Sequence, residues 1–362
     1  MDLRGLSGKN AVIYDCLWKN KEFEFKTDEN SNSIKIQSEK EKECEAIEEA
    51  FSISNKYVFK NKYEQAIDGD GNEKEKILSL HSSSRCSLLC FYNVEEKPIT
   101  LEVDNKKITF NYSTFEFKNP VIGSPSNMDV VLISEDEKTV LFLESKFSEY
   151  YMSSGNISGF ISNSYKEPYK DKKKKKHSVS IYDRLDELEL KSTNCTQNYK
   201  DKNGKEHTRH GFKLKTIDNS LNYLDGIKQM ISHYIGVRRR LDGDSLSEDT
   251  KNENKEKIYK KVLEIVRNSE SAVYLGEILF DKFYLSNECK KDNLDDPKVI
   301  LENYSKLYEK FANILNDEIQ KSESEYKNRF KVLAKHINYS DVMKKNESQI
   351  DEKILKFYGI VE

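Results

Sequence analysis

The spacing of apolar and polar residues changes along the chain and predicts a sheet near its middle. Residues 99–117 alternate apolar and polar side chains around Asp104 and Asn105, which is typical of a β-hairpin. Two apolar runs follow at 128–134 and 139–147, and a short acidic turn separates them. Runs of this length are typical of strands buried on both faces, so they predict a second antiparallel pair at the centre of the sheet.

Helical spacing flanks this region. The Glu- and Lys-rich residues from 37 to about 54 predict a surface helix, and residues 73–94 predict one or two buried helical stretches. A run of serines at 82–84 can cap the second of these stretches. Between 219 and 237, apolar residues recur at the spacing of one buried helix face, which predicts a further helix.

The remaining segments complete a mixed pattern. Residues 1–36 predict a strand pair or a loosely packed arm, and residues 271–280 predict one more buried strand. Residues 150–215 are polar and irregular, which is typical of an insertion, and amphipathic helix follows from about 296 to 359. The order helix, antiparallel strands, insertion, helix, strand and helices predicts an α+β or mixed α/β core.

Composition excludes several classes of protein. The 362 residues include 60 Lys and Arg against 63 Asp and Glu, so the formal net charge is −3. No segment approaches the roughly 20 apolar residues of a membrane helix, and the N-terminus lacks the pattern of a secretion signal. We therefore expect a cytoplasmic protein with no membrane partner. The nearly balanced charge gives no sign of wholesale attraction to nucleic acid, but it allows a local basic groove.

Three charged residues stand out on the predicted central hairpin. Asp129 lies at the start of its first strand, and Glu144 and Lys146 lie at the end of its second. Residues two apart on a strand project from one face, about 7 Å from each other, and the turn brings Asp129 back beside Glu144. Two carboxylates and an amine suit metal-assisted hydrolysis of a phosphodiester, because oxygen ligands hold Mg²⁺ while the ammonium offsets developing charge.

This arrangement resembles the PD-(D/E)xK, or restriction-endonuclease-like, nuclease superfamily. In that family an Asp on one strand is followed by Glu-x-Lys on the next, and Asp129, Glu144 and Lys146 match this pattern. Many members also have a Gln or Tyr on the helix after these strands. Gln229 and His233, which share a polar stripe at i,i+4 spacing, resemble that element.

The resemblance implies a fold, a cofactor and a role for each residue. The fold is a restriction-endonuclease-like αβββαβ core with a mixed central sheet. The cofactor is Mg²⁺, for which Mn²⁺ can substitute, held by Asp129, Glu144 and the carbonyl of Ser145. Lys146 would serve the attacking water or the transition state, and Gln229 would orient the site or touch the substrate backbone.

Weaker candidates and one departure accompany this match. Acidic residues that flank the motif can complete the site in members of this type, so Glu116 and Glu149 are carried over as candidates. His233 is a candidate for contact with the substrate or for support of the ligands. Met128 stands where the family pattern has Pro, a position that varies in the family.

Other interpretations of the same residues stay open. The tripeptide alone carries little weight, because Glu-x-Lys also occurs at 24–26, 116–118, 189–191, 253–255 and 288–290. A rival set consists of Asp104, Glu116 and Lys118, although there the Asp lies in a turn and not on an apolar strand. The simplest alternative for residues 144 and 146 is a solvated, charged strand end.

A basic run lies in the predicted insertion. It comprises Lys172, Lys173, Lys174, Lys175 and Lys176. Such a run is usually a solvated loop, but its position soon after the Glu-x-Lys strand allows a flap that follows nucleic-acid phosphates. The alternative surface for backbone contact is at the end of the Gln229 helix, formed by Lys228, Arg238, Arg239 and Arg240.

Together these features predict a Mg²⁺-dependent nuclease, a restriction-type endonuclease acting on DNA rather than RNA, and they allow a homodimer. The alternative is a nucleic-acid-binding or interaction protein that keeps the fold without cleaving. The expected organisation has three parts. These are an N-terminal arm and surface helix (1–70), a nuclease core (71–285) with a polar insertion at about 150–215, and a C-terminal helical extension (286–362).

Overall fold

A computed structural model describes most of the chain. The described residues are 8–18, 25–28, 33–36, 42–68, 73–121, 124–152, 157–166, 169–170, 176–177, 180–200, 203–217, 223–246, 253–285, 294–322 and 324–361. Within these ranges, no helix is both long enough and apolar enough to cross a membrane.

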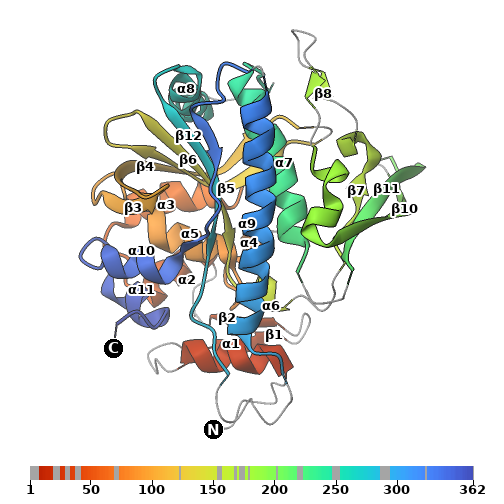
Figure 1. Ribbon diagram of the computed structural model, residues 1–362. Coiled ribbons are helices and arrows are strands. Elements are labelled where there is room, and N and C mark those ends of the chain that lie inside the picture. The colour runs from red at the N-terminus through yellow and green to blue at the C-terminus, as the bar shows by residue number, and fades with distance from the viewer. Residues whose placement is uncertain are drawn as a thin grey trace.

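A seven-stranded mixed sheet forms the centre of the structure (Figure 1). Its strands are β3 (Ile99–Val103), β4 (Lys106–Asn119), β5 (Ser126–Ser134), β6 (Thr139–Lys146), β12 (Ala272–Leu279), β13 (Phe330–Val332) and β14 (Ile337–Asn338). Strands β3 to β6 are antiparallel neighbours, whereas β12 is parallel to β6, and β13 and β14 are parallel to β12. The sheet curls, and an ion pair joins Lys331 on β13 to Asp104 in the β3–β4 turn.

Helices cover both faces of this sheet (Figure 1). One face carries α3 (Lys56–Ala66), α5 (Ser83–Phe91), α10 (Tyr339–Lys345) and α11 (Glu352–Phe357). The other face carries α7 (Asp225–Leu241), α8 (Glu253–Arg267) and α9 (Pro297–Lys321). Because side chains alternate along a strand, β6 directs Ser145 toward the first face and Glu144 and Lys146 toward the second. The structure is therefore of the α+β class with a mixed, curled sheet, as predicted.

Shorter elements surround this core. The N-terminal ones are α1 (Gly8–Trp18), β1 (Phe25–Asp28), β2 (Ser33–Ile36), α2 (Glu43–Ala50) and α4 (Glu73–Lys76). Those between β6 and α7 are α6 (Glu149–Met152), β7 (Ile161–Ser162), β8 (Tyr169–Lys170), β9 (Lys176–His177), β10 (Leu190–Lys200) and β11 (Glu206–Thr216), with three short 3-10 helices, Asn163–Lys166, Ser180–Asp183 and Leu185–Leu188.

Local sequence signals explain the elements next to the site. The predicted β3–β4 hairpin is confirmed, and Asp104 and Asn105 in its turn have φ angles of 51° and 61°. Asp and Asn tolerate this left-handed region better than other non-glycine residues, and a two-residue turn requires it. Ser82 caps α5 as predicted, since its hydroxyl accepts a hydrogen bond from the backbone N–H of Arg85 at 3.0 Å.

Four local predictions are wrong or incomplete. In the N-terminal part the predicted strand pair is present as β1 and β2, but residues 8–18 form α1, because a short apolar run fits either period. The charged segment before β12 contains α8, a helix that the predicted order of elements lacks, because its apolar stripe is hidden among many charges. The C-terminal part, predicted as helix, also contributes β13 and β14 to the sheet. The insertion, predicted as irregular, contains the long β10–β11 pair, whose mostly polar strands give no apolar alternation.

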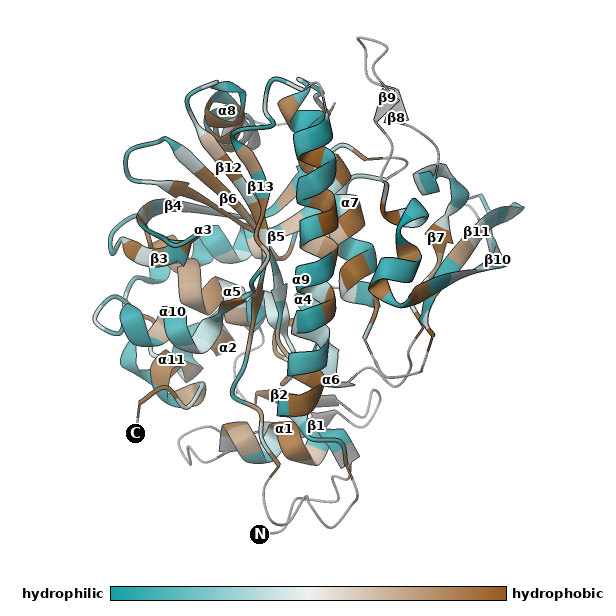
Figure 2. Ribbon diagram, viewed as in Figure 1, coloured by the Kyte–Doolittle hydropathy of each residue, from teal (hydrophilic) through white to brown (hydrophobic). Residues whose placement is uncertain are grey.

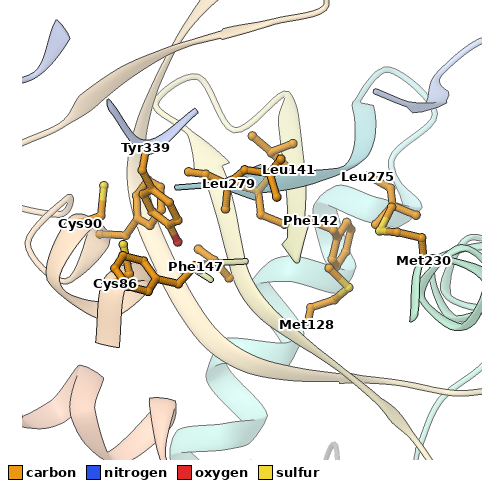
Figure 3. Packing of buried hydrophobic residues seen from close by; sticks show 14 of the residues in the cluster. Cys86, Cys90, Met128, Leu141, Phe142, Phe147, Met230, Leu275, Leu279 and Tyr339 are labelled. Carbon is orange, nitrogen blue, oxygen red and sulfur yellow. The ribbon is translucent and has the colours of Figure 1, made fainter. Parts of the chain in front are cut away.

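Apolar side chains fill both sides of the central strands. Figure 2 shows them concentrated along β6 and β12, while the exposed side of α9 is hydrophilic. In Figure 3, Cys86 and Cys90 lie beside Tyr339 and Phe147. Burial raises the pKa of both thiols well above their usual range, so they act as small apolar residues.

One helix end and one strand edge are closed by buried polar side chains. Arg240, at the end of α7, donates to the Lys118 carbonyl at 2.6 Å and lies over the rings of Phe117 and Tyr259. Asn346 accepts from the N–H of Thr100 on β3 at 2.8 Å and donates to its carbonyl at 3.1 Å. The backbone N–H and C=O of Thr100, which point outward from the sheet edge, therefore both have hydrogen-bond partners.

We expect Arg240→Met to lower the free energy of unfolding by about 2–4 kcal/mol. The change keeps the apolar stem but leaves the Lys118 and Asp244 carbonyls without their buried donor. Urea denaturation followed by circular dichroism measures the difference. The control is Arg267→Met at the exposed end of α8, expected to change stability by less than about 0.5 kcal/mol. Equal changes in the two variants would contradict the structural role of Arg240.

Candidate active site

The site lies where β5 and β6 separate. Their antiparallel register ends at the pair Val130 and Leu143, so the two strands are no longer paired beyond it. Asp129 sits in this gap, and its Oδ2 accepts a hydrogen bond from the Ser145 N–H at 2.6 Å. Glu144 and Lys146 follow on β6 and are 3% and 4% exposed. The predicted convergence of Asp129, Glu144 and Lys146 is present.

Helix α7 completes the surroundings of the buried pair. Lys146 Nζ lies 2.5 Å from Glu144 Oε1 and donates to Gln229 Oε1 at 2.7 Å. His233, one turn after Gln229, places Nε2 2.7 Å from Glu144 Oε2, and its Nδ1 bonds the hydroxyl of Ser126 at 2.5 Å. The polar stripe predicted on this helix therefore faces the Glu-x-Lys strand, and Gln229 contacts the lysine directly.

These charges shift one another's pKa values. Burial alone would raise the pKa of Glu144, but Lys146 and His233 outweigh it and lower that pKa to about 2. Burial would likewise lower the pKa of Lys146, but Glu144 holds it well above its usual range. Burial raises the pKa of Asp129 strongly, and the carboxylates of Glu144 and Glu116 raise it further. Glu144 is thus a stable anion, whereas the cluster resists a second negative charge on Asp129.

The two flanking acids occupy different places. Glu116 is buried in β4, where the register puts it opposite Asp129, and it lines the same cavity as Asp129 and Glu144. Its φ of 50° is a left-handed conformation that is costly for a non-glycine residue inside a strand. Glu149 lies at the other side of the site and accepts a hydrogen bond from the Phe147 N–H at 2.6 Å.

Solvent-accessible space surrounds the cluster. A cavity of about 740 Å³ is lined by Asp129, Glu144, Lys146 and Gln229, together with the serines at the start of α5. A smaller one of about 230 Å³ adjoins it and is also lined by Asp129, Glu144 and Gln229. A third of about 620 Å³ shares Gln229 with both and continues toward β7 and β11. The charged cluster therefore borders an open, polar cleft and is not sealed inside the core.

The donor atoms suit a hard divalent cation. The N–H and C=O of one strand residue point to the same side, so the Ser145 carbonyl faces the gap that holds Asp129. Across the part of the chain that the structure describes, no three His, Cys, Asp or Glu side chains are grouped as a metal site. Asp129, Glu144 and the Ser145 carbonyl form a smaller set, which Mg²⁺ accepts because it keeps several waters.

Charge also favours a cation at this place. Burial is the main cause of the raised pKa of Asp129, and the carboxylates of Glu144 and Glu116 raise it further, so a cation beside Asp129 would favour its ionised form. Lys146 and His233 each lie next to one oxygen of Glu144, so a cation has to share or displace one of them. The residues present therefore fit Mg²⁺ on condition that the contacts of Glu144 rearrange.

Sequence reasoning missed one buried acid. Glu277 on β12 pairs in register with Glu144 on β6, so the two side chains share a face. It is fully buried, accepts hydrogen bonds from Tyr304 at 2.8 and 3.0 Å, and lies 3.2 Å from His336 Nε2. The available signal was a single charged residue inside the apolar run at 271–280, which requires a buried partner.

Other predicted sets are not assembled at the site. In the rival set, Asp104 lies in the distant β3–β4 turn and pairs with Lys331, away from Glu116. At the end of α7, Arg238 and Arg240 are buried and Arg239 pairs with Asp244, so these three guanidinium groups are bound within the protein and do not form the alternative surface. Lys228, its fourth member, is half-buried and lines the 620 Å³ cavity. Of the basic run, Lys172, Lys173, Lys174 and Lys175 lie outside the described residues, and Lys176 is described only as part of β9.

The opposite pKa shifts predict opposite effects of two isosteric changes on stability. Asp129→Asn removes a group whose folded-state pKa is raised, so the melting temperature should rise at pH 7. The melting temperature of the wild type should fall further below that of Asp129→Asn as the pH rises above the ordinary Asp pKa of about 4. Glu144→Gln should instead lower the melting temperature, because it leaves Lys146 buried without a counter-charge.

Thermal unfolding between about pH 2 and pH 8 tests this pair of variants. A lowered folded-state pKa stabilises above the ordinary value, so the contribution of Glu144 should disappear as the pH falls from about 4.5 toward about 2. Changes of the same sign in the melting temperatures of Asp129→Asn and Glu144→Gln at pH 7 would contradict the electrostatic description.

Comparison with known proteins adds no further guide to this site. No family model, curated protein or solved structure matches the chain. The chemistry assigned to the cluster consequently depends on its own geometry and charge.

Proposed function

We propose that this protein is a metal-dependent nuclease that hydrolyses phosphodiester bonds, with DNA as substrate and restriction-type endonuclease action. The observation that carries the proposal is the meeting of Asp129, Glu144 and Lys146 at the border of an open cleft, with Gln229 on the lysine. A merely solvated strand end does not explain why Glu144 and Lys146 are buried.

The order of elements supports a restriction-endonuclease-like core. Helix α5, strands β4 to β6, helix α7 and strand β12 follow the αβββαβ order. The connection from β6 through α7 to the parallel neighbour β12 has the crossover that such a core needs. Strands β3, β13 and β14 extend the sheet at its two edges.

Each residue has a distinct task in the proposed reaction. Asp129, Glu144 and the Ser145 carbonyl would hold Mg²⁺, which when bound polarises a phosphate oxygen and acidifies a coordinated water. Lys146 would carry positive charge to the scissile phosphate or orient the water. Gln229 fixes the lysine through its Oε1, and His233 holds the second oxygen of Glu144.

A digestion panel tests the proposal directly. Duplex DNA, single-stranded DNA and RNA are each incubated with the full chain in Mg²⁺, in Mn²⁺ and in EDTA. We expect cleavage of duplex DNA in either metal and none in EDTA. Intact substrates under all conditions would overturn the proposal and leave a non-cleaving binding protein as the alternative.

We expect Asp129→Ala, Glu144→Ala and Lys146→Ala each to reduce the rate of cleavage by at least about 100-fold. Removal of a ligand or of the ammonium withdraws charge stabilisation from the transition state. Single-turnover cleavage of duplex DNA measures the effect. Glu135→Ala and Lys138→Ala, exposed in the turn of the same hairpin, are matched controls that should retain full activity. Full activity in Asp129→Ala or Glu144→Ala would refute the site.

Gln229→Ala should slow cleavage while leaving metal binding nearly intact. Gln229 contacts Lys146 and no proposed ligand, so its loss frees the lysine without removing an oxygen donor. The rise in melting temperature on addition of Mn²⁺ reports metal binding, because a ligand of the folded state stabilises it. This rise should persist in Gln229→Ala and vanish in Glu144→Ala. Its loss in both would assign Gln229 to the metal site itself.

A further inference from the structure

The β10–β11 pair forms a two-stranded ribbon, residues 190–200 and 206–216, next to α7 (Figure 1). Strand β11 also pairs with β7, whereas β10 is an outer edge. Paired residues of an antiparallel register project from the same face, so the register divides the ribbon into two faces. Leu190, Phe212 and Leu214 mark one face and are buried against the protein.

The opposite face of the ribbon is basic. The pairs on this cationic face include Lys191 with Lys215, Thr193 with Lys213, Gln197 with Arg209, and Tyr199 with His207. The single acidic residue of the two strands, Glu206, belongs to the other face and pairs with Lys200. Since Lys191, Lys213 and Arg209 are exposed, the face presents positive charge that no acid on the same face offsets.

A stack of rings orders this face near the turn that joins the two strands. The guanidinium of Arg209 lies 5.2 Å from the ring centre of Phe160 and 4.9 Å from that of Tyr199, and Nε donates to Gln197 at 3.0 Å. The ring of His207 stacks on Tyr199 with centres 5.4 Å apart. A guanidinium held in this way loses little conformational freedom when it binds a phosphate.

The cationic face continues into the cleft beside Asp129, Glu144 and Lys146, which are the catalytic cluster of the proposed nuclease. The 620 Å³ cavity is lined by Gln197 and Arg209 from the ribbon and by Lys228 and Gln229 from α7. Gln229 also borders the cavity that holds Asp129 and Lys146. A polyanion lying on the ribbon can therefore extend to the catalytic cluster without crossing an acidic surface of the ribbon.

We propose that the cationic face of the ribbon binds the phosphate backbone of duplex DNA beside the catalytic cluster. The proposal rests on the proposed nuclease function for the identity of the polyanion. Lys213 and Lys215 lie two residues apart on β11, so they project from the same face about 7 Å from each other. Contacts of this kind position the substrate and do not read its sequence.

Fluorescence anisotropy of a labelled 20-base-pair DNA duplex in EDTA, with the full chain, tests the ribbon separately from catalysis. Changing Lys191, Lys213 and Lys215 together to Gln should weaken binding at low salt by at least about tenfold. Each lost phosphate contact should reduce the slope of log K against log salt by about 0.9. The control changes Lys56, Lys60 and Lys344 to Gln, three exposed lysines on the helices of the opposite sheet face. Changing Lys191, Lys213 and Lys215 to Arg instead should preserve the wild-type slope of log K against log salt.

The outcomes separate the two proposals. Equal affinities and slopes for the ribbon variant and the control would overturn the ribbon proposal and leave the nuclease proposal standing. The ribbon proposal would also be overturned if the wild type did not bind duplex DNA and bound only single-stranded DNA or RNA. Reduced binding in the ribbon variant, together with no cleavage in Mg²⁺ by the wild type, would support the ribbon and overturn the nuclease. Melting temperatures close to that of the wild type verify that all variants are folded.

Discussion

The buried pair of Glu144 and Lys146 is the interaction on which the site and much of the core depend. Moving either charge out of water costs several kcal/mol unless an opposite charge and hydrogen bonds replace the water. The pair supplies the charges, and Gln229 and His233 on α7 supply the remaining partners. Strand β6 is therefore compatible with the sheet interior only when α7 lies across it, so the central packing and the charged cluster of Glu144, Lys146, Gln229 and His233 form together.

The sequence predicts the part of the site that is local. Asp129, Glu144 and Lys146 lie on one hairpin, whose two apolar strands and short turn determine their meeting. Gln229 is 83 residues from the lysine that it contacts, and only a resemblance to a family pattern indicated it. The apolar periodicity predicts the helix that carries Gln229, but it does not predict how far that helix lies from β6. That distance depends on packing across the whole sheet.

Burial changed the interpretation of several charged residues. Arg238 and Arg240 follow Gln229 in a basic run that is typical of an exposed surface. In the structure they are enclosed by aromatic rings and carbonyl groups. The ribbon of the insertion was missed for the opposite reason. Its strands are so largely exposed that they need no apolar alternation, and a pattern based on burial does not detect them.

Two neighbouring strands each bury a glutamate at the same level, but their surroundings differ. Glu277 is enclosed by the neutral hydroxyl of Tyr304 and by His336, and it does not line the cavities of about 740 and 230 Å³ that Glu144 lines. Glu144 is held by a cation and lines two of them. The first arrangement satisfies a carboxylate, whereas the second keeps one ionised at the border of solvent.

The pairing of Asn346 with Thr100 affects how copies of this protein meet. The outer strand of an open sheet is a template on which another chain can add a strand, the first step of many aggregation processes. Here a side-chain amide already occupies the exposed N–H and C=O of Thr100 on β3. Strand β10, the outer edge of the smaller sheet, is protected by its lysines and polar residues instead. A sheet continued from one molecule to the next across β3 would first have to expel Asn346 from Thr100.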